Sequence, residues 1–231
     1  MVDVQTQLWI WDHEITSFMV LNSGIDSQSN LRFIFLCMEW SMHGALWLIF
    51  SSFIFLVSMR YNFSLNMRHE LAVLIFGLCA DLVVVGIIKG IARRSRPPFD
   101  IKDQLYEAPL VDKFSFPSGH SSRGAMLSAK FLHCHFGNFC TRLANEALFS
   151  RFSLTFFCSL PQFITLFVKL FPFVLGASRI FIGRHYVSDV MIGLLLGYAE
   201  GNFVQCLPLH TVDALKQMFP LIFGSNEQRD A

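Results

Sequence analysis

Long apolar runs are the feature that most constrains the fold of this chain. Four stretches contain one charged residue or none, and they cover residues 41–59, 71–88, 152–175 and 190–209. A helix of about 18 or more apolar residues can cross the roughly 30 Å hydrocarbon core of a bilayer. Only 15% of the residues are charged, which is too few to cover a soluble globule of this size. We therefore predict an all-α fold, a polytopic transmembrane helical bundle.

The apolar pattern divides the chain into an N-terminal segment, a membrane domain and a polar tail. The expected boundaries are residues 1–30, 31–210 and 211–231. About five spans are expected inside the membrane domain, near residues 41–59, 70–90, 120–137, 152–177 and 189–208. Residues 31–40 are apolar but short, so they either extend the first span or form a separate re-entrant piece.

Residues 5–22 predict an amphipathic helix at the membrane interface. They mix apolar side chains with acidic residues such as Asp12 and Glu14. Trp9 and Trp11 are suited to anchor such a helix, because amphipathic aromatic rings prefer the headgroup region. We therefore expect this segment to lie on the membrane rather than to cross it.

Two polar loops, at residues 91–119 and 178–188, are separated by two expected spans. They therefore lie on the same side of the membrane. Lysine and arginine are balanced between the two sides, so the positive-inside rule does not orient the chain. The net charge of +1 gives no indication of a nucleic-acid partner.

Four charged residues interrupt the predicted helices at a similar depth. Asp81, Lys130, Lys169 and Glu200 are expected about 12–17 Å below the face that holds the two loops, at about 1.5 Å per helical residue. Charged side chains left unpaired in lipid are costly. We therefore predict that Lys169 pairs with Glu200 and Asp81 with Lys130.

Three short segments on the shared face contain the residues that can carry chemistry. They are KGIARRSRP at Lys89–Pro97, PSGH at Pro117–His120 and SRIFIGRHYVSD at Ser178–Asp189. Taken singly, each has an ordinary explanation, as basic anchors at a helix end, a helix cap or a structural histidine. Because all three lie on one face, together they predict a phosphate site.

Lys89, Arg96 and Arg179 supply three cations for this site. Three such donors can bind the non-bridging oxygens of a phosphoryl group and neutralise the charge of its transition state, so no metal or other cofactor is expected. Ser118 and Gly119 open a helix, whose first N–H groups and positive dipole end favour an anion.

His120 and His185 supply two groups for proton transfer and nucleophilic attack. His185 and Asp189 are four residues apart and share a face if a helix begins near His185. The carboxylate can then accept a proton from one ring nitrogen and leave the other free to attack phosphorus. His120 has no such partner nearby in sequence and is better suited to protonate the leaving oxygen.

The three segments resemble the signature motifs of the type 2 phosphatidic acid phosphatase (PAP2) superfamily. The motifs are Lys, six residues, Arg-Pro; then Pro-Ser-Gly-His; then Ser-Arg, five residues, His, three residues, Asp. Every specified position is filled here, in order and with the right spacing. The resemblance implies a helical core shared with the haloperoxidases and a phosphatase that acts in the membrane.

The resemblance also implies a role for each motif residue. His120 would be the general acid, His185 the nucleophile that becomes phosphorylated, and Asp189 the residue that orients His185. Phosphate would be bound by the remaining polar positions, with Ser178 supporting the site through hydrogen bonds: Lys89, Arg96, Ser118, Gly119, Ser178 and Arg179.

The text KFSFPSGHSSRGAML and the paired arginines before Arg96 are most similar to the presqualene and polyisoprenoid diphosphate phosphatases. That resemblance implies residence in the endoplasmic reticulum and nuclear envelope. Phosphatidate, lysophosphatidate and sphingoid phosphates are alternative substrates. A sugar phosphatase of the glucose-6-phosphatase kind would need more spans, and an inactive membrane scaffold would not need to keep every motif residue.

Overall fold

The computed structural model describes residues 3–25, 29–61, 63–100, 113–133 and 154–207. Every regular element among these residues is an α-helix, so the all-α prediction is confirmed. The helices are α1 (Val4–Asn22), α2 (Asn30–Ser41), α3 (Gly44–Arg60), α4 (Leu65–Ala92), α5 (Gly119–His133), α7 (Leu154–Phe181) and α8 (Val187–Gln205). The predicted polar tail at 211–231 lies outside the described residues.

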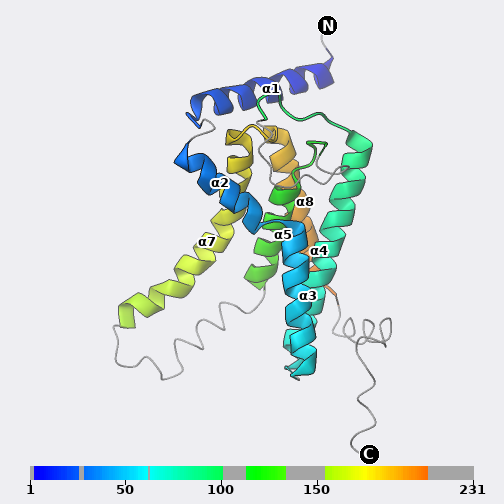
Figure 1. Cartoon of the computed structure of the whole chain (residues 1–231), viewed down its shortest axis with the longest axis vertical. Helices are drawn as coiled ribbons and strands as arrows, with labels where there is room; N and C mark the ends of the chain where they lie inside the picture. Colours follow the sequence, from blue (N-terminus) through cyan, green and yellow to red (C-terminus); the bar gives the residue numbers. More distant parts are fainter. Residues whose placement is uncertain (1–2, 26–28, 62, 101–112, 134–153, 208–231) are drawn as a thin grey trace, which may run out of the picture.

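Helix α5 lies at the centre of the molecule and packs against α4, α7 and α8 (Figure 1). Helix α1 lies across one end of this bundle, where it contacts α7 and α8. That crosswise position fits the interfacial helix expected from residues 5–22. The same end holds the end of α4, the start of α5, the end of α7 and the start of α8, so the three motif segments meet beneath α1.

Not every helix of the bundle is apolar enough to cross a membrane alone. Among the described residues, α4 and residues 163–181 of α7 have the required length and hydropathy. Helices α2 and α3, bent by 46° at their junction, would make a third span if they act as one. The other expected spans coincide with α5 and α8. Helix α5 is short and polar, which is tolerated because its residues 121–130 are all buried by neighbouring helices.

Three glycines four residues apart bring α8 close to α5. They are Gly193, Gly197 and Gly201, all of them buried. A Cβ atom added at Gly197 would lie 1.9 Å from the carbonyl oxygen of Ser122, so only glycine fits there. Small residues at this spacing allow membrane helices to pack backbone against backbone. The glycines therefore fix the distance between the two helices that carry His120 and Asp189.

The predicted pairing of the four interior charges is wrong. Asp81 accepts a hydrogen bond from Ser122 at 2.6 Å and forms an ion pair with Arg123 at 2.8 Å. Lys130 pairs instead with Glu70, which lies about three helical turns before Asp81 on α4. Arg123 also donates to the carbonyl oxygen of Met42 at the bend between α2 and α3, at 3.0 Å.

The rotation of α8 about its own axis explains why Lys169 and Glu200 do not form an ion pair. The glycine contact turns α8 so that Glu200 faces the Asp81 and Arg123 side of the bundle, where it interacts electrostatically with both. Lys169 lies on a part of α7 whose side chains are largely exposed, and its own side chain is exposed as well. The chain therefore keeps a polar cluster inside the bundle, but with partners that depth alone could not identify.

Candidate active site

Backbone hydrogen bonds join the three motif segments at one end of the bundle. The amide of Ser115 donates to the carbonyl oxygen of Arg94 at 2.9 Å, and the amide of Ser118 donates to that of Asp189 at 3.0 Å. The prediction that the loops at 91–119 and 178–188 share a face is thus confirmed. These bonds also fix PSGH against the start of α8.

The end of α4 brings the first motif to the site. Lys89 lies in the last turn, and its buried Nζ donates to the carbonyl oxygen of Phe114 at 3.1 Å. Arg93 follows the helix in the left-handed conformation, with φ of 46°, and its amide donates to the carbonyl oxygen of Lys89 at 3.0 Å. This cap turns the chain so that Arg94 and Arg96 run back across the site.

Arg179 presents one edge of its guanidinium without a partner. The side chain is fully buried, and its Nη1 donates to Glu39 at 2.6 Å. Its Nε and Nη2 have no hydrogen-bond partner in the described part of the chain. These two nitrogens form the fork that binds carboxylate or phosphate through parallel hydrogen bonds. A buried donor pair of this kind is costly unless an anion satisfies it.

His185 lies in the connection between α7 and α8, beside the carboxylate expected to orient it. Its Nδ1 is 3.7 Å from Oδ2 of Asp189, which is longer than a hydrogen bond. Asp189 is itself held on both oxygens: Oδ2 accepts from the amide of Tyr186 at 2.9 Å and Oδ1 from Arg94 at 2.8 Å. Catalytic hydrogen bonds are often long in the absence of substrate and shorten on binding.

His120 faces the same group of side chains from the first turn of α5. It interacts electrostatically with Arg179, His185 and Lys89. Its Nε2 is buried and lacks a hydrogen-bond partner among the residues described. The two motif histidines are therefore placed around the open edge of Arg179, as the predicted roles of acid and nucleophile require.

The small polar residues of the motifs have partners of their own. Ser118 hydrogen-bonds through its hydroxyl to Ser121 at 2.9 Å, and its amide is used by Asp189, so that amide is not free for an anion. Ser178 donates to the carbonyl oxygen of Leu175 at 2.6 Å. Gly119 starts α5. Phosphate binding by these three residues stays a prediction.

The surroundings of His185 lower the pKa of its imidazole well below the ordinary value of 6.5. Burial is the main cause, and the positive charges of Arg96, Arg179 and Lys89 act in the same direction. A hydrogen bond to the backbone of Ser115 opposes them. The imidazole is therefore neutral at neutral pH, which is the state that can attack phosphorus.

The lowered pKa of His185 predicts where kcat/KM falls on the acid side of its pH profile. Because His185 stays neutral as the pH falls through 6.5, kcat/KM should begin to fall only below that pH, once the ionisation of the substrate is taken into account. The measurement is kcat/KM between pH 4.5 and 8 with a substrate of known phosphate pKa. A limb centred at or above pH 6.5 would contradict the assignment of His185 as a neutral nucleophile.

Five charged residues around the site were not predicted from the sequence as site residues. Glu39 binds Arg179, and Arg184 is fully buried with its Nε 3.4 Å from Glu39 and its Nη1 3.3 Å from Asp100. Asp12 and Arg94 bond to each other at 2.6 Å. The usable signal was an acid inside an apolar stretch, as at Glu39 between Met38 and Trp40.

A family model described as the PAP2 superfamily matches residues 70–209 of this chain, a range that includes all three motifs. The chain belongs to the PAP2 superfamily. A curated relative, the probable lipid phosphate phosphatase beta of Arabidopsis thaliana, is 34% identical over 65% of this chain and 71% of its own length. The phosphatidylglycerophosphatase B of Bacillus subtilis is 30% identical over 55% of this chain and 51% of its own length.

Two solved structures show the same fold. The transmembrane PAP2-type phosphatidylglycerolphosphate phosphatase of Bacillus subtilis matches 86% of this chain and 85% of its own, with a TM-score of 0.55 and 21% identity. LpxE of Aquifex aeolicus matches 84% of this chain and 94% of its own, with a TM-score of 0.52 and 20% identity. The predicted helical membrane bundle is confirmed, and the chain is an integral membrane protein of the PAP2 superfamily.

Proposed function

We propose that this PAP2 protein is a membrane phosphatase that hydrolyses a phosphate or diphosphate monoester of a lipid through a phosphohistidine. One observation carries the proposal. The open Nε and Nη2 edge of Arg179 is buried within electrostatic reach of both motif histidines. A phosphoryl group bound there would satisfy the guanidinium and stand between a nucleophile and an acid. The relatives named as lipid phosphatases support the same activity.

The reaction has two steps. Nδ1 of His185 faces Asp189, so the other ring nitrogen attacks phosphorus and the bond from phosphorus to the leaving oxygen breaks as His120 protonates that oxygen. Neutral His120 then takes a proton from water, whose oxygen attacks the phosphohistidine and releases phosphate. Lys89, Arg96 and Arg179 neutralise the phosphoryl oxygens in both steps. No step requires a metal.

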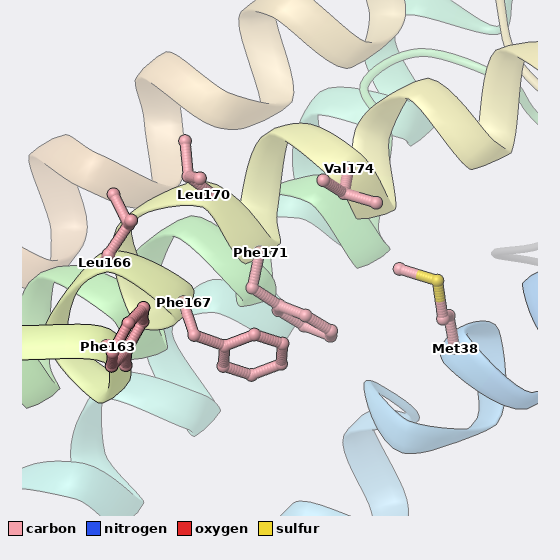
Figure 2. A pocket seen from close by; sticks show the side chains of 7 residues that line it. All are labelled: Met38, Phe163, Leu166, Phe167, Leu170, Phe171 and Val174. Atoms are coloured by element: carbon pink, nitrogen blue, oxygen red, sulfur yellow. The ribbon is translucent and has the colours of Figure 1, made fainter. Parts of the chain in front are cut away.

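An apolar groove beside the site supports a lipid substrate. It lies between α2 and α7 with a volume of about 520 Å³ (Figure 2). Its lining is Met38, Phe163, Leu166, Phe167, Leu170, Phe171 and Val174. Met38 directly precedes Glu39, which binds Arg179, so one end of the groove adjoins the phosphate-binding arginine. We propose that the hydrocarbon tail of the substrate occupies this groove.

A polyisoprenoid or presqualene diphosphate is the substrate that we favour, and the endoplasmic reticulum with the nuclear envelope the location. The support is the sequence around PSGH and the paired arginines at Arg93 and Arg94. The alternative is a phosphatidate, lysophosphatidate or sphingoid phosphate, which the name of the Arabidopsis thaliana relative, a probable lipid phosphate phosphatase, favours.

One substrate panel tests the proposed function. The purified full chain would be assayed for phosphate release in EDTA against farnesyl diphosphate, presqualene diphosphate, phosphatidate and glucose 6-phosphate. We expect the lipid substrates to be hydrolysed and the diphosphates to be preferred. Faster hydrolysis of glucose 6-phosphate than of any lipid would overturn the proposal, and a preference for phosphatidate would select the alternative.

A pair of matched variants tests the groove. Leu170 lines it and is 50% exposed, whereas Leu195 on α8 lies outside it and is 63% exposed. Leu170→Trp should lower kcat/KM for a long-chain substrate by about tenfold, since tail binding contributes to transition-state binding, and should spare a short-chain analogue. Leu195→Trp should change neither. Equal rates in both variants on the long-chain substrate would argue against the groove as the tail site.

A further inference from the structure

A chain of charged hydrogen bonds connects the N-terminal helix α1 to the candidate nucleophile. Nη2 of Arg94 donates to Oδ2 of Asp12 at 2.6 Å, and Nη1 of the same guanidinium donates to Oδ1 of Asp189 at 2.8 Å. Asp189 in turn lies 3.7 Å from His185. The side chains of Asp12 and Arg94 are only 11% and 19% exposed. Charged hydrogen bonds shielded from water in this way are strong and directional.

Ser188 adds two hydrogen bonds to the network between Asp12 and Arg94. Its hydroxyl accepts from Nη1 of Arg94 at 2.6 Å and donates to Oδ2 of Asp12 at 2.5 Å. The guanidinium of Arg94 also lies over the ring of Tyr186, 4.0 Å from its centroid. Arg94 is therefore fixed on three sides, by α1, by the start of α8 and by an aromatic ring.

Helix α1 also caps the helix that carries Asp189. Oδ1 of Asp12 accepts from the amide of Ser188 at 3.0 Å, and the hydroxyl of Thr16 accepts from the amide of Val187 at 3.2 Å. Amides in the first turn of a helix have no partner inside the helix, so a neighbouring acceptor fixes where the helix starts. Thr16 is fully buried in this contact. Asp189, in the first turn of α8, is thus placed by a segment more than 170 residues earlier in the sequence.

We propose that Asp12 and Arg94 are positioning residues of the reaction, so that α1 is part of the catalytic unit and not only an interfacial anchor. The proposal rests on the proposed function, because it acts through Asp189 on His185. With Asp12 in place, the charge of Arg94 is shared between two carboxylates. Without Asp12 the guanidinium has Asp189 as its one remaining carboxylate in this network, which draws that carboxylate away from His185 and makes it a weaker proton acceptor.

Helix α1 also exposes apolar side chains. Leu8, Trp11, Ile15 and Phe18 lie along one side of the helix, each more than half exposed. Exposed apolar and tryptophan side chains suit the membrane interface. Helix α1 therefore carries an exposed apolar stripe as well as the acid that bonds to the site.

A matched set of variants tests the proposal. Asp12 and Glu14 lie two residues apart on α1, but Glu14 is exposed. Asp12→Ala should lower kcat by about tenfold with KM within about twofold of wild type, because a small misplacement of a reacting group slows the chemical step. Asp12→Asn keeps the size of the side chain and part of its hydrogen bonding, so its kcat should fall less than that of Asp12→Ala. Glu14→Ala should match wild type.

Rapid mixing in a single turnover separates positioning from loss of folded protein. If Asp12 positions the site, Asp12→Ala should form the phosphoenzyme more slowly per active site, and the losses in Asp12→Ala and Arg94→Gln should not add in the double variant. An unchanged rate per active site with a smaller amplitude would overturn the proposal and leave Asp12 as a structural cap. Full activity of His185→Ala would overturn the proposed function itself, which is a separate result.

Discussion

Replacement of His185 by alanine is expected to abolish turnover. In the proposed reaction the imidazole supplies the electron pair that displaces the leaving oxygen. Loss of a nucleophile typically lowers kcat by more than about 10⁴-fold. The measurement is phosphate release by purified His185→Ala and wild type in the same detergent.

A second variant controls for loss of the site as a whole. His185→Asn keeps a polar side chain of similar size and should still bind the substrate, with little change in KM, while kcat is lost. EDTA should leave the wild-type rate unchanged, and vanadate, which mimics the phosphoryl transition state, should inhibit it. Activity lost in EDTA and restored by Mg²⁺ would contradict the metal-free reaction.

The second large effect is expected at His120 and depends on the leaving group. In the proposed reaction His120 is the general acid that protonates the departing oxygen, and acid catalysis contributes about 10²- to 10⁴-fold when that oxygen leaves poorly. His120→Ala should therefore show the full loss on an alkyl phosphate or diphosphate and a loss below about tenfold on p-nitrophenyl phosphate. The comparison needs kcat for both substrates in both enzymes.

Two results would separate acid catalysis from other roles of His120. Equal losses on both substrates would indicate that the imidazole only binds phosphate. Arg179→Lys offers a contrast, because lysine keeps the charge but cannot present the Nε and Nη2 fork. Arg179→Lys should lower kcat for both substrates by the same factor.

The arrangement of the motif residues was predictable because each motif is local and the number of crossings between motifs is fixed. Lys89, His120 and His185 each lie at or near a helix end, so counting spans was enough to bring them to one face. The glycines of α8 were visible in the sequence at a spacing of four, but their role in setting the distance to α5 emerges only from the packed helices.

Partners that depend on helix rotation or on distant segments could not be predicted. Asp81 was expected to pair with a lysine at similar depth, yet Arg123 reaches it because that face of α5 turns toward α4. Asp12 lies at the opposite end of the chain from Ser188, and no local pattern connects them. The hydropathy of α5 was also a poor guide, since a helix buried by its neighbours need not be apolar.

The central claim is that a phosphoryl group passes through His185, and trapping that intermediate tests it most directly. Wild type would be mixed with substrate labelled in the terminal phosphate, quenched in alkali, in which phosphohistidine survives, and digested for mass spectrometry. The account predicts a label on the peptide that contains His185, absent from His185→Asn and slow to form in Asp12→Ala. A label on His120 or on a carboxylate, or turnover without any trapped phosphoenzyme, would contradict it.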